Sequence, residues 1–509
     1  MTSTRSWFLA AAALIGLSPV QIQAQELHSG PSQFSDVQPT DWAYQALDNL
    51  NRVYGCFVGY PGGSLRGNQA ITRYEAAALL NACLEHTTEI TDDLRRLINE
   101  FAAELAIQRG RVDGLEARVG ELDATAFSTT TTLEGSVNFV VGANRFMGSA
   151  GRLVRQNNSE FGATSFNTNL VLQLNTSFTG KDLLFTELRS GTLGPRTSFG
   201  GGGPSNQSWL DVAYDSTTDS DSIRLDIARL YTVVPISDTV NLIAGPLVAQ
   251  NEMLAINPSL YASDPILNVA SMGGAPLALN QNEGAGAGIS WEPLPGMHVS
   301  ANYIAIMGAD GNSSTGGIAT NHAGGTGSLQ LGYQDGPWTL AATYSGLQHG
   351  EAQDPYATPR FVQTIQDNPG FTHAFGLGGS WQPADSGWIP TISAGWGINR
   401  SNYDPGVERH GLAQISQSWT LGLEWNDALV PGNNAGMAVG QPVFITSQYG
   451  GGTPDDGNFI WEWWYQFQLT DAISITPALF YLSRPTGENS PDGKRFSQLG
   501  GLVLTSFKF

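Results

Sequence analysis

The chain has 509 residues, 14% of them charged, and a formal net charge of −21. This acidity argues against nucleic acid as a partner. A mean hydropathy of −0.14 is too polar for a bundle of membrane helices, and no apolar run of about 18 residues occurs beyond the N-terminus. The 61 glycines and 13 tryptophans suit a β-rich fold, but no repeat of about 40 residues indicates a propeller.

The first residues have the pattern of an export signal. Arg5 supplies a positive charge, Trp7 to Leu17 form a short apolar core, and Ile22-Gln23-Ala24 is a plausible cleavage site. The apolar core is too short to anchor the chain across a bilayer. We therefore expect residues 1–24 to be removed and the mature protein to be exported.

Residues 34–86 are predicted to form a small helical module. Thr72 begins its second helix with Glu75 in capping-box position. The segments FSDVQPTDWAYQAL and ITRYEAAALL resemble a single S-layer homology (SLH) domain, with Tyr74 where the family usually has alanine. The resemblance implies binding to peptidoglycan-linked polysaccharide, so we expect the module to lie in the periplasm.

The same resemblance supplies candidate residues for binding the cell-wall polysaccharide: Trp42, Gly59, Tyr60 and Arg73. The Trp42 ring suits stacking on a sugar, and the Arg73 guanidinium suits bidentate hydrogen bonding to a carboxylate. Alternatively, Trp42 is a core side chain and Arg73 a charge on the helix surface. Family members usually join three such units. Since this chain has one, a complete binding head would require chains to associate.

Cys56 and Cys83 are the two cysteines of the chain, and both lie in this module. In an exported protein such a pair is expected to form a disulfide, which would stabilise the module by about 3 kcal/mol in the chain-entropy model. Two buried free thiols are the alternative. With no histidine pair nearby, a metal site is not expected.

Residues 89–125 carry a seam of apolar side chains at heptad-like spacing. From Ile90 to Leu122 the steps alternate between four and three residues, with one additional step of four after Phe101. A lone amphipathic helix needs a globular surface to lie on, and the sequence offers none next to it. The seam therefore predicts a coiled-coil spacer in a homotrimer, with packing on a globular core as the less favoured alternative.

Residues 128–509 are predicted to form a transmembrane antiparallel β-barrel of about 16 strands, so the fold class is mainly β. From Phe459 to Leu469, large apolar side chains occupy every second position, and mostly polar ones alternate with them. The same alternation recurs along this region, and short turns alternate with long Gly/Asn/Ser-rich connections. Together these features indicate apolar side chains facing lipid and polar ones facing water. The last strand ends on Phe509 and resembles the assembly signal of outer-membrane barrels.

The connection at about residues 249–283 follows the fifth predicted strand. By analogy with general porins we expect it to fold inward and narrow the pore, with a surface loop as the alternative. Four residues are candidates for the constriction: Glu252 and Asp264 in the connection, and Arg189 and Arg229 on nearby strands. The carboxylates would favour cations, and the arginines would oppose that preference.

The barrel also resembles the OprB-type carbohydrate-selective porin family. The matching segments are GLEW at 422–425, PGN at 431–433, GMAVGQP at 436–442 and FYLSRP at 480–485. With the export signal, one SLH unit and a coiled coil, the architecture is similar to cyanobacterial outer-membrane porins, some of them called iron uptake porins. This implies passive diffusion of inorganic ions, iron included, or of sugars across the outer membrane, with lipid and wall polysaccharide as partners. The alternative is a structural tether from membrane to wall with a narrow or closed pore.

Nothing in the sequence indicates an enzyme. The seven histidines show no paired ligand spacing, and no nucleophile elbow, phosphate loop or dinucleotide fingerprint occurs. We therefore predict no catalytic residue, no metal site and no cofactor.

Overall fold

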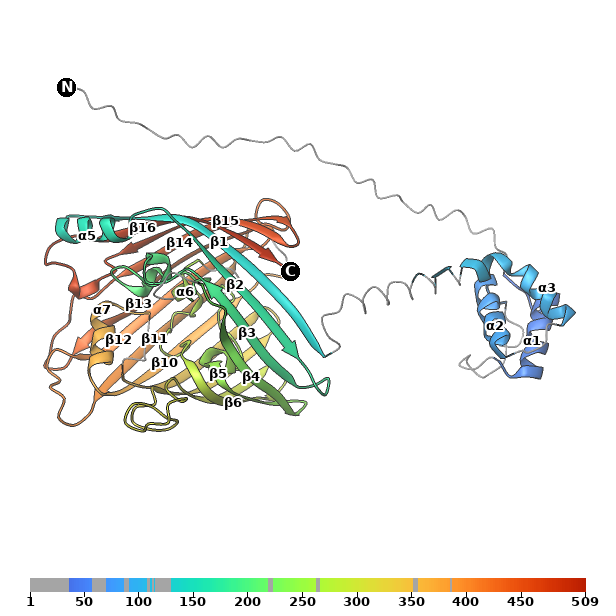
Figure 1. The fold of residues 1–509 in the computed structure, drawn as a ribbon, viewed down its shortest axis with the longest axis horizontal. Coiled ribbons are helices and arrows are strands. Elements are labelled where there is room, and N and C mark those ends of the chain that lie inside the picture. The colour runs from blue at the N-terminus through green and yellow to red at the C-terminus, as the bar shows by residue number, and fades with distance from the viewer. Residues whose placement is uncertain are drawn as a thin grey trace, which may run out of the picture. The chain divides into compact units, whose positions relative to one another are not determined.

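The computed structural model describes residues 36–56, 70–86, 91–107, 110–111, 114, 130–217, 223–261, 266–350, 356–384 and 387–509. The chain divides into two compact units, Met1–Ala126 and Phe127–Phe509 (Figure 1). Among the helices of the described ranges, none combines the length and apolar character needed to cross a bilayer.

The first unit contains helices α1 (Trp42–Tyr54), α2 (Arg73–His86) and α3 (Asp92–Glu100). An antiparallel bridge between Val37 and Ile71 and a disulfide between Cys56 and Cys83 connect the segments around α1 and α2. Gly55 ends α1 in the left-handed conformation at φ 61°, which glycine adopts without steric cost, and its N–H bonds to the Asn51 carbonyl at 2.7 Å.

Helix α3 belongs to the core of this unit, which differs from the sequence-based expectation. Leu94, Leu97, Phe101 and Leu105, all on the predicted coiled-coil seam, are at most 9% exposed and pack in one cluster with α1 and α2. Two short helices leave an apolar side uncovered, and α3 covers it within the same chain. Because residues 108–125 lie almost wholly outside the described ranges, a coiled coil there stays a prediction.

The second unit is a closed barrel of sixteen strands, in which each strand pairs antiparallel with the next and β1 pairs with β16. This confirms the predicted fold class and strand number. The strands are β1 (Thr131–Met147), β2 (Ser165–Thr176), β3 (Leu183–Gly191), β4 (Asp226–Ser237), β5 (Val240–Ala249), β6 (Glu283–Leu294), β7 (Met297–Ala305), β8 (Gly325–Asp335), β9 (Trp338–Gln348), β10 (Gly370–Trp381), β11 (Thr391–Tyr403), β12 (Ala413–Trp425), β13 (Asn434–Gln448), β14 (Phe459–Thr470), β15 (Ile473–Ser483) and β16 (Ser497–Lys508).

Short helices lie in the connections between strands. They are α5 (Gly151–Phe161), η1 (Ser198–Gly200), η2 (Asn206–Ser208), η3 (Gln250–Met253), α6 (Asn268–Ser271), α7 (Pro359–Asp367) and η4 (Gly487–Asn489). Figure 1 shows α6 within the barrel outline, and α5 and α7 toward the end opposite the short turns. The long connections gather at that end, which is the outer side in outer-membrane barrels.

Strand β14 shows the predicted alternation of side chains. Phe459, Trp463 and Phe467 are 39–44% exposed, whereas Ile460 and Glu462 are 1% exposed. The first set faces outward, toward lipid. The second set faces the lumen, but it is not uniformly polar, which the sequence pattern did not predict.

Two connections fold into the lumen and cover its apolar side chains. We call residues 192–217 and 223–225, between β3 and β4, loop A, and residues 250–261 and 266–282, between β5 and β6, loop B. They pair at a bridge in which Asp211 N–H bonds to the Ile266 carbonyl and Asn268 N–H to the Trp209 carbonyl, each at 3.0 Å. Side chains of both loops form one buried cluster with inner residues of β13 to β16 and β1, including Val140, Ile460, Trp464, Phe480, Leu482 and Leu502. The loops thus supply the cover that these strands need.

Candidate transport pathway

Loop B is attached to the inner wall of the barrel over many strands. Its backbone N–H groups at Ala255 and Ile256 donate to Ser300 Oγ at 3.0 Å and to Gln330 Oε1 at 3.1 Å. Three more serines bind its backbone: Ser345 and Ser418 donate to loop carbonyls at 2.7 and 2.8 Å, and Ser393 accepts from two loop amides at 3.1 Å. The loop therefore lies inside the lumen.

The tip of loop B is attached to β14. The Tyr261 hydroxyl donates to Glu462 Oε1 at 2.6 Å, and Leu267 N–H donates to Glu462 Oε2 at 2.7 Å. Trp464 Nε1 donates to the Tyr261 hydroxyl oxygen at 3.0 Å. Gly422 makes room for this tip, since a Cβ there would lie 2.5–2.8 Å from atoms of Tyr261. A glycine is therefore needed at the first position of the GLEW segment so that Tyr261 can pack against β12.

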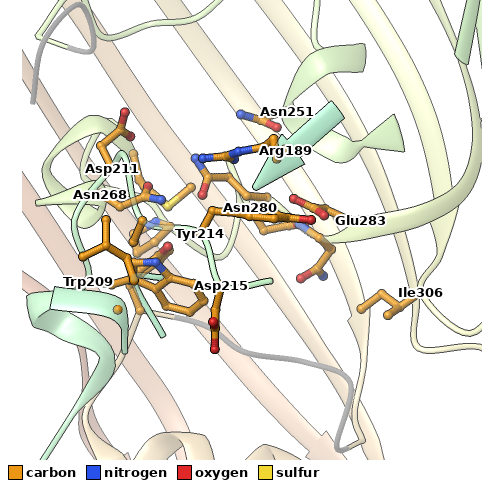
Figure 2. Close-up of a pocket in the computed structure, with 18 of the residues that line it drawn as sticks. Arg189, Trp209, Asp211, Tyr214, Asp215, Asn251, Asn268, Asn280, Glu283 and Ile306 are labelled. Carbon is orange, nitrogen blue, oxygen red and sulfur yellow. The ribbon is translucent and has the colours of Figure 1, made fainter. Parts of the chain in front are cut away.

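A cavity of about 580 Å³ remains between loops A and B and the wall at β3 and β4 (Figure 2). Its lining is rich in charged, amide and aromatic side chains. Those most relevant to a solute are Arg189, Trp209, Asp211, Tyr214, Asp215, Arg229, Asn251, Glu252, Asn268, Asn280, Asn282 and Glu283. Figure 2 shows Trp209, Tyr214, Asp211 and Asp215, all from loop A, on one side of Arg189, and Glu283 on the other. We call this space the lumen cavity.

Both arginines of the lumen cavity lie near carboxylates. Arg229, whose side chain is 12% exposed, bonds to Glu252 at 2.9 Å and to Glu283 at 2.7 Å. Arg189 lies 3.9 Å from Glu187, and its guanidinium stands 4.6 Å from the centre of the Tyr214 ring. The lining holds two arginines against four carboxylates, a formal charge of −2. The lumen cavity therefore carries a modest excess of negative charge.

The structure brings three of the four predicted constriction residues together, since Arg189, Arg229 and Glu252 line one cavity. Asp264 lies outside the described residues. The sequence did not indicate Asp211 and Asp215, which reach the cavity through the inward fold of loop A, or Glu283, which stands at the start of β6. The aromatic and acidic segment from Trp209 to Asp215, in an otherwise Gly/Ser-rich loop, was the available signal for loop A.

In the first unit, two of the four predicted polysaccharide-binding residues, Arg73 and Trp42, already have partners within the chain. Arg73 bonds to Glu104 Oε1 at 2.7 Å and to Glu100 Oε1 at 2.9 Å, and these contacts raise its pKa, with the Glu104 hydrogen bond contributing most. Trp42 lies under the guanidinium of Arg96, at 3.9 Å from the ring centre. Gly59 and Tyr60 lie outside the described residues. A ligand carboxylate at Arg73 would have to compete with Glu100.

Comparison with known proteins identifies relatives along nearly the whole chain. The family described as "Carbohydrate-selective porin, OprB family" matches residues 90–499, and the S-layer homology domain matches residues 33–77. An uncharacterized protein of Nostoc is 31% identical over 96% of this chain and 86% of its own length, and one of Synechocystis is 29% identical over 96% and 93%. The solved structure of Pseudomonas putida OprB at high pH is 11% identical, with a TM-score of 0.46 over 78% of this chain and 97% of its own.

Proposed function

Because the chain belongs to the OprB family of carbohydrate-selective porins and carries an S-layer homology domain, we propose that this outer-membrane protein passes small hydrophilic solutes by passive diffusion. The solutes are inorganic ions, iron among them, and small sugars. Passive flux needs a water-filled path of suitable width and lining, and no catalytic group.

The observation that carries this proposal is the lumen cavity. It lies inside a closed barrel, and its charged and amide side chains can replace part of the hydration shell of a passing solute. Since carboxylates outnumber arginines in its lining, the pore should prefer cations. Asn251, Asn268, Asn280 and Asn282 add neutral donors and acceptors that suit hydroxyl groups.

We further propose that the first unit anchors the barrel to peptidoglycan-linked polysaccharide through Trp42 and Arg73. The S-layer homology match supports this assignment. Assembly as a homotrimer would bring three such units together, with the remaining heptad seam in residues 108–125 as the contact. In this proposal the polymer displaces Glu100 and Arg96 when it binds.

A second function, a structural tether with a narrow or closed pore, is favoured by one observation. Loops A and B pack against the inner faces of β13 to β16 and β1, so this side of the lumen is filled by a buried apolar cluster. The lumen cavity lies beside β3 and β4, between the wall and the described residues of the two loops.

Conductance separates the two functions. The detergent-purified full-length protein is incorporated into planar bilayers in KCl, and single-channel steps are recorded with and without iron salts or sugars. Discrete steps that these solutes reduce would support the diffusion pore and rank the solutes. A heat-modifiable, folded barrel without steps would contradict it and leave the tether. Cosedimentation with peptidoglycan sacculi tests the anchor independently, with Arg73→Gln expected to weaken it.

A further inference from the structure

The outer surface of the barrel carries a groove over β7 to β10, near the end where the long connections gather. Its volume is about 1050 Å³. Outward-facing side chains and glycines of these four strands line it: Tyr303, Gly327, Leu329, Tyr344, Gly346 and Phe371. Their neighbours Ser328, Ser345 and Thr372 are at most 6% exposed and face the lumen. We call this feature the outer groove.

Missing side chains give the outer groove its depth. A Cβ at Gly346 would lie 2.6 Å from the ring of Phe371, so no larger residue fits there without movement. A Cβ at Gly327 would meet only ordinary contacts, at 3.7 and 3.8 Å. The space above Gly327 is therefore open, and a larger side chain could fill it without disturbing the strand.

The upper edge of the outer groove is polar. The connection after β7 contacts it, since Ala319 N–H donates to the Tyr303 hydroxyl at 3.3 Å and Gln348 Nε2 donates to the Thr320 carbonyl at 3.3 Å. Asn321 and Asp404 also line the groove. An apolar, aromatic channel with a polar upper edge has the character of a site for an amphiphile.

A cationic side chain lies beside the groove on the same outer surface. Arg400 of β11 is exposed and stands directly opposite His373 of β10 in the strand register. His373 Nδ1 is hydrogen-bonded to the Tyr344 hydroxyl at 2.9 Å, and its ring lies 5.0 Å from Phe371, which joins it to the groove.

No carboxylate shares the outward faces of β10, β11 and β12 with Arg400 in the described structure. The outward neighbours of Arg400 on these strands are His373, Ile398, Asn402, Ile415 and Gln417. An arginine on the lipid-facing surface of a barrel is unfavourable unless it lies near the headgroups or has an anionic partner. The protein chain supplies no such partner on these faces, so a partner from the membrane is the natural one.

We propose that Arg400, His373 and the outer groove form a binding site for an anionic lipid of the surrounding membrane. The headgroup bonds to the Arg400 guanidinium, which presents a fork of N–H donors, and one acyl chain lies in the groove over Gly327. Charge complementarity selects an anionic over a zwitterionic lipid, and burial of the chain against Tyr303, Leu329 and Phe371 retains it.

Native mass spectrometry of the full-length protein tests the site. The detergent-purified protein is titrated with phosphatidylglycerol or with phosphatidylcholine of identical acyl chains, and retained lipid is counted. Wild type is expected to retain phosphatidylglycerol several-fold more than phosphatidylcholine. Arg400→Gln should abolish this preference, and Gly327→Leu should reduce retention of both lipids. Arg145→Gln is the matched control and should behave as wild type. It removes an exposed arginine of β1 at the end of the barrel where the long connections gather.

Heat-modifiable migration on gels verifies that each variant barrel is folded. Equal retention of the two lipids by wild type, or an unchanged preference in Arg400→Gln, would overturn the proposal. A Gly327→Leu variant that changes the oligomeric state and leaves lipid retention unchanged would also overturn it, because a second copy of the chain would then occupy the groove.

Discussion

The Tyr261 hydroxyl donates a hydrogen bond of 2.6 Å to the Glu462 carboxylate, joining two residues 201 positions apart. Loop B leaves the wall after β5, and this contact holds its tip on β14. Because the tip is held there, the open part of the lumen lies on the side of β3 and β4. In the proposed pore, this pair therefore holds the tip of loop B away from the lumen cavity.

Replacing Tyr261 with phenylalanine should loosen loop B and increase single-channel conductance and its open-state noise. The change leaves Trp464 Nε1 without its acceptor and removes one of the donors to Glu462, at a cost of about 1–3 kcal/mol in unfolding free energy. Planar-bilayer recording and thermal unfolding measure the two effects.

Tyr465→Phe is the matched control for this prediction. Tyr465 also donates a hydrogen bond, to the Ala428 carbonyl at 2.6 Å, but it lies on the outward side of β14. Removing the Tyr465 hydroxyl should lower the unfolding free energy without altering single-channel conductance. Equal conductance in Tyr261→Phe and wild type would show that the contact does not limit the pore.

Arg229→Gln should make the pore more selective for cations. It leaves Glu252 and Glu283 without their cation and takes the formal charge of the lumen cavity from −2 to −3. Glu283→Gln should make the pore less selective for cations, because it takes the formal charge of the lumen cavity from −2 to −1. Because the Glu283 side chain is 46% exposed, the folding cost should stay below the roughly 3–5 kcal/mol of a fully buried pair.

The reversal potential in a KCl gradient measures this selectivity. High salt serves as the control, since screening should bring the three proteins together. Reversal potentials that do not separate the two variants at low salt would mean that these charges lie off the conduction path.

The barrel could be predicted from the sequence because its signal is local. In β14 the period-two pattern alone separates Trp463 from Glu462. The apolar lumen-facing residues Ile460 and Trp464 could not be explained in this way, because their cover comes from loops A and B, hundreds of residues away. The lining of the lumen cavity depends on the same distant contact between the loops.

Helix α3 shows the same limit in the first unit. Its periodicity correctly indicates an apolar face containing Leu94 and Leu97. Periodicity does not say which surface covers that face. Here α1 and α2 of the same chain cover it. Residue spacing alone cannot distinguish this intramolecular packing from a coiled coil between chains.

Glu100→Gln should strengthen binding of the protein to peptidoglycan sacculi if Arg73 binds the wall polysaccharide. The change weakens one of the two ion pairs of the Arg73 guanidinium, the one of 2.9 Å, and leaves the pair with Glu104. Such a part-exposed pair contributes about 0.2–1 kcal/mol, so affinity should rise by up to about fivefold. Cosedimentation with sacculi measures this affinity.

Asp93→Asn removes an exposed acidic charge from the same helix and is the control. Similar gains in both variants would indicate a general charge effect, and no gain in either would remove Arg73 from the proposed site.

Acid should destabilise the barrel through His349, which follows β9 and is 7% exposed. Its Nδ1–H donates to the Asn368 carbonyl at 3.0 Å, and its Nε2 accepts from the Thr372 hydroxyl at 2.8 Å, an arrangement that suits the neutral ring. Burial lowers the pKa of His349 from 6.5 to about 4. The unfolded chain therefore takes up a proton at a higher pH than the folded chain. Stability from the neutral ring is present above about pH 6.5 and is lost as the pH falls toward 4.

His349→Gln should flatten this pH dependence, because glutamine keeps a donor and an acceptor but does not titrate. The unfolding temperature of wild type should fall between pH 6.5 and 4 relative to that of the variant, by an amount equivalent to at most about 3 kcal/mol. His322→Gln, at an exposed position in the connection after β7, should leave the wild-type profile unchanged. Since acidic side chains also titrate in this range, the difference between the wild-type and His349→Gln profiles isolates the histidine. Parallel profiles would mean that His349 takes up its proton equally in the folded and unfolded chains.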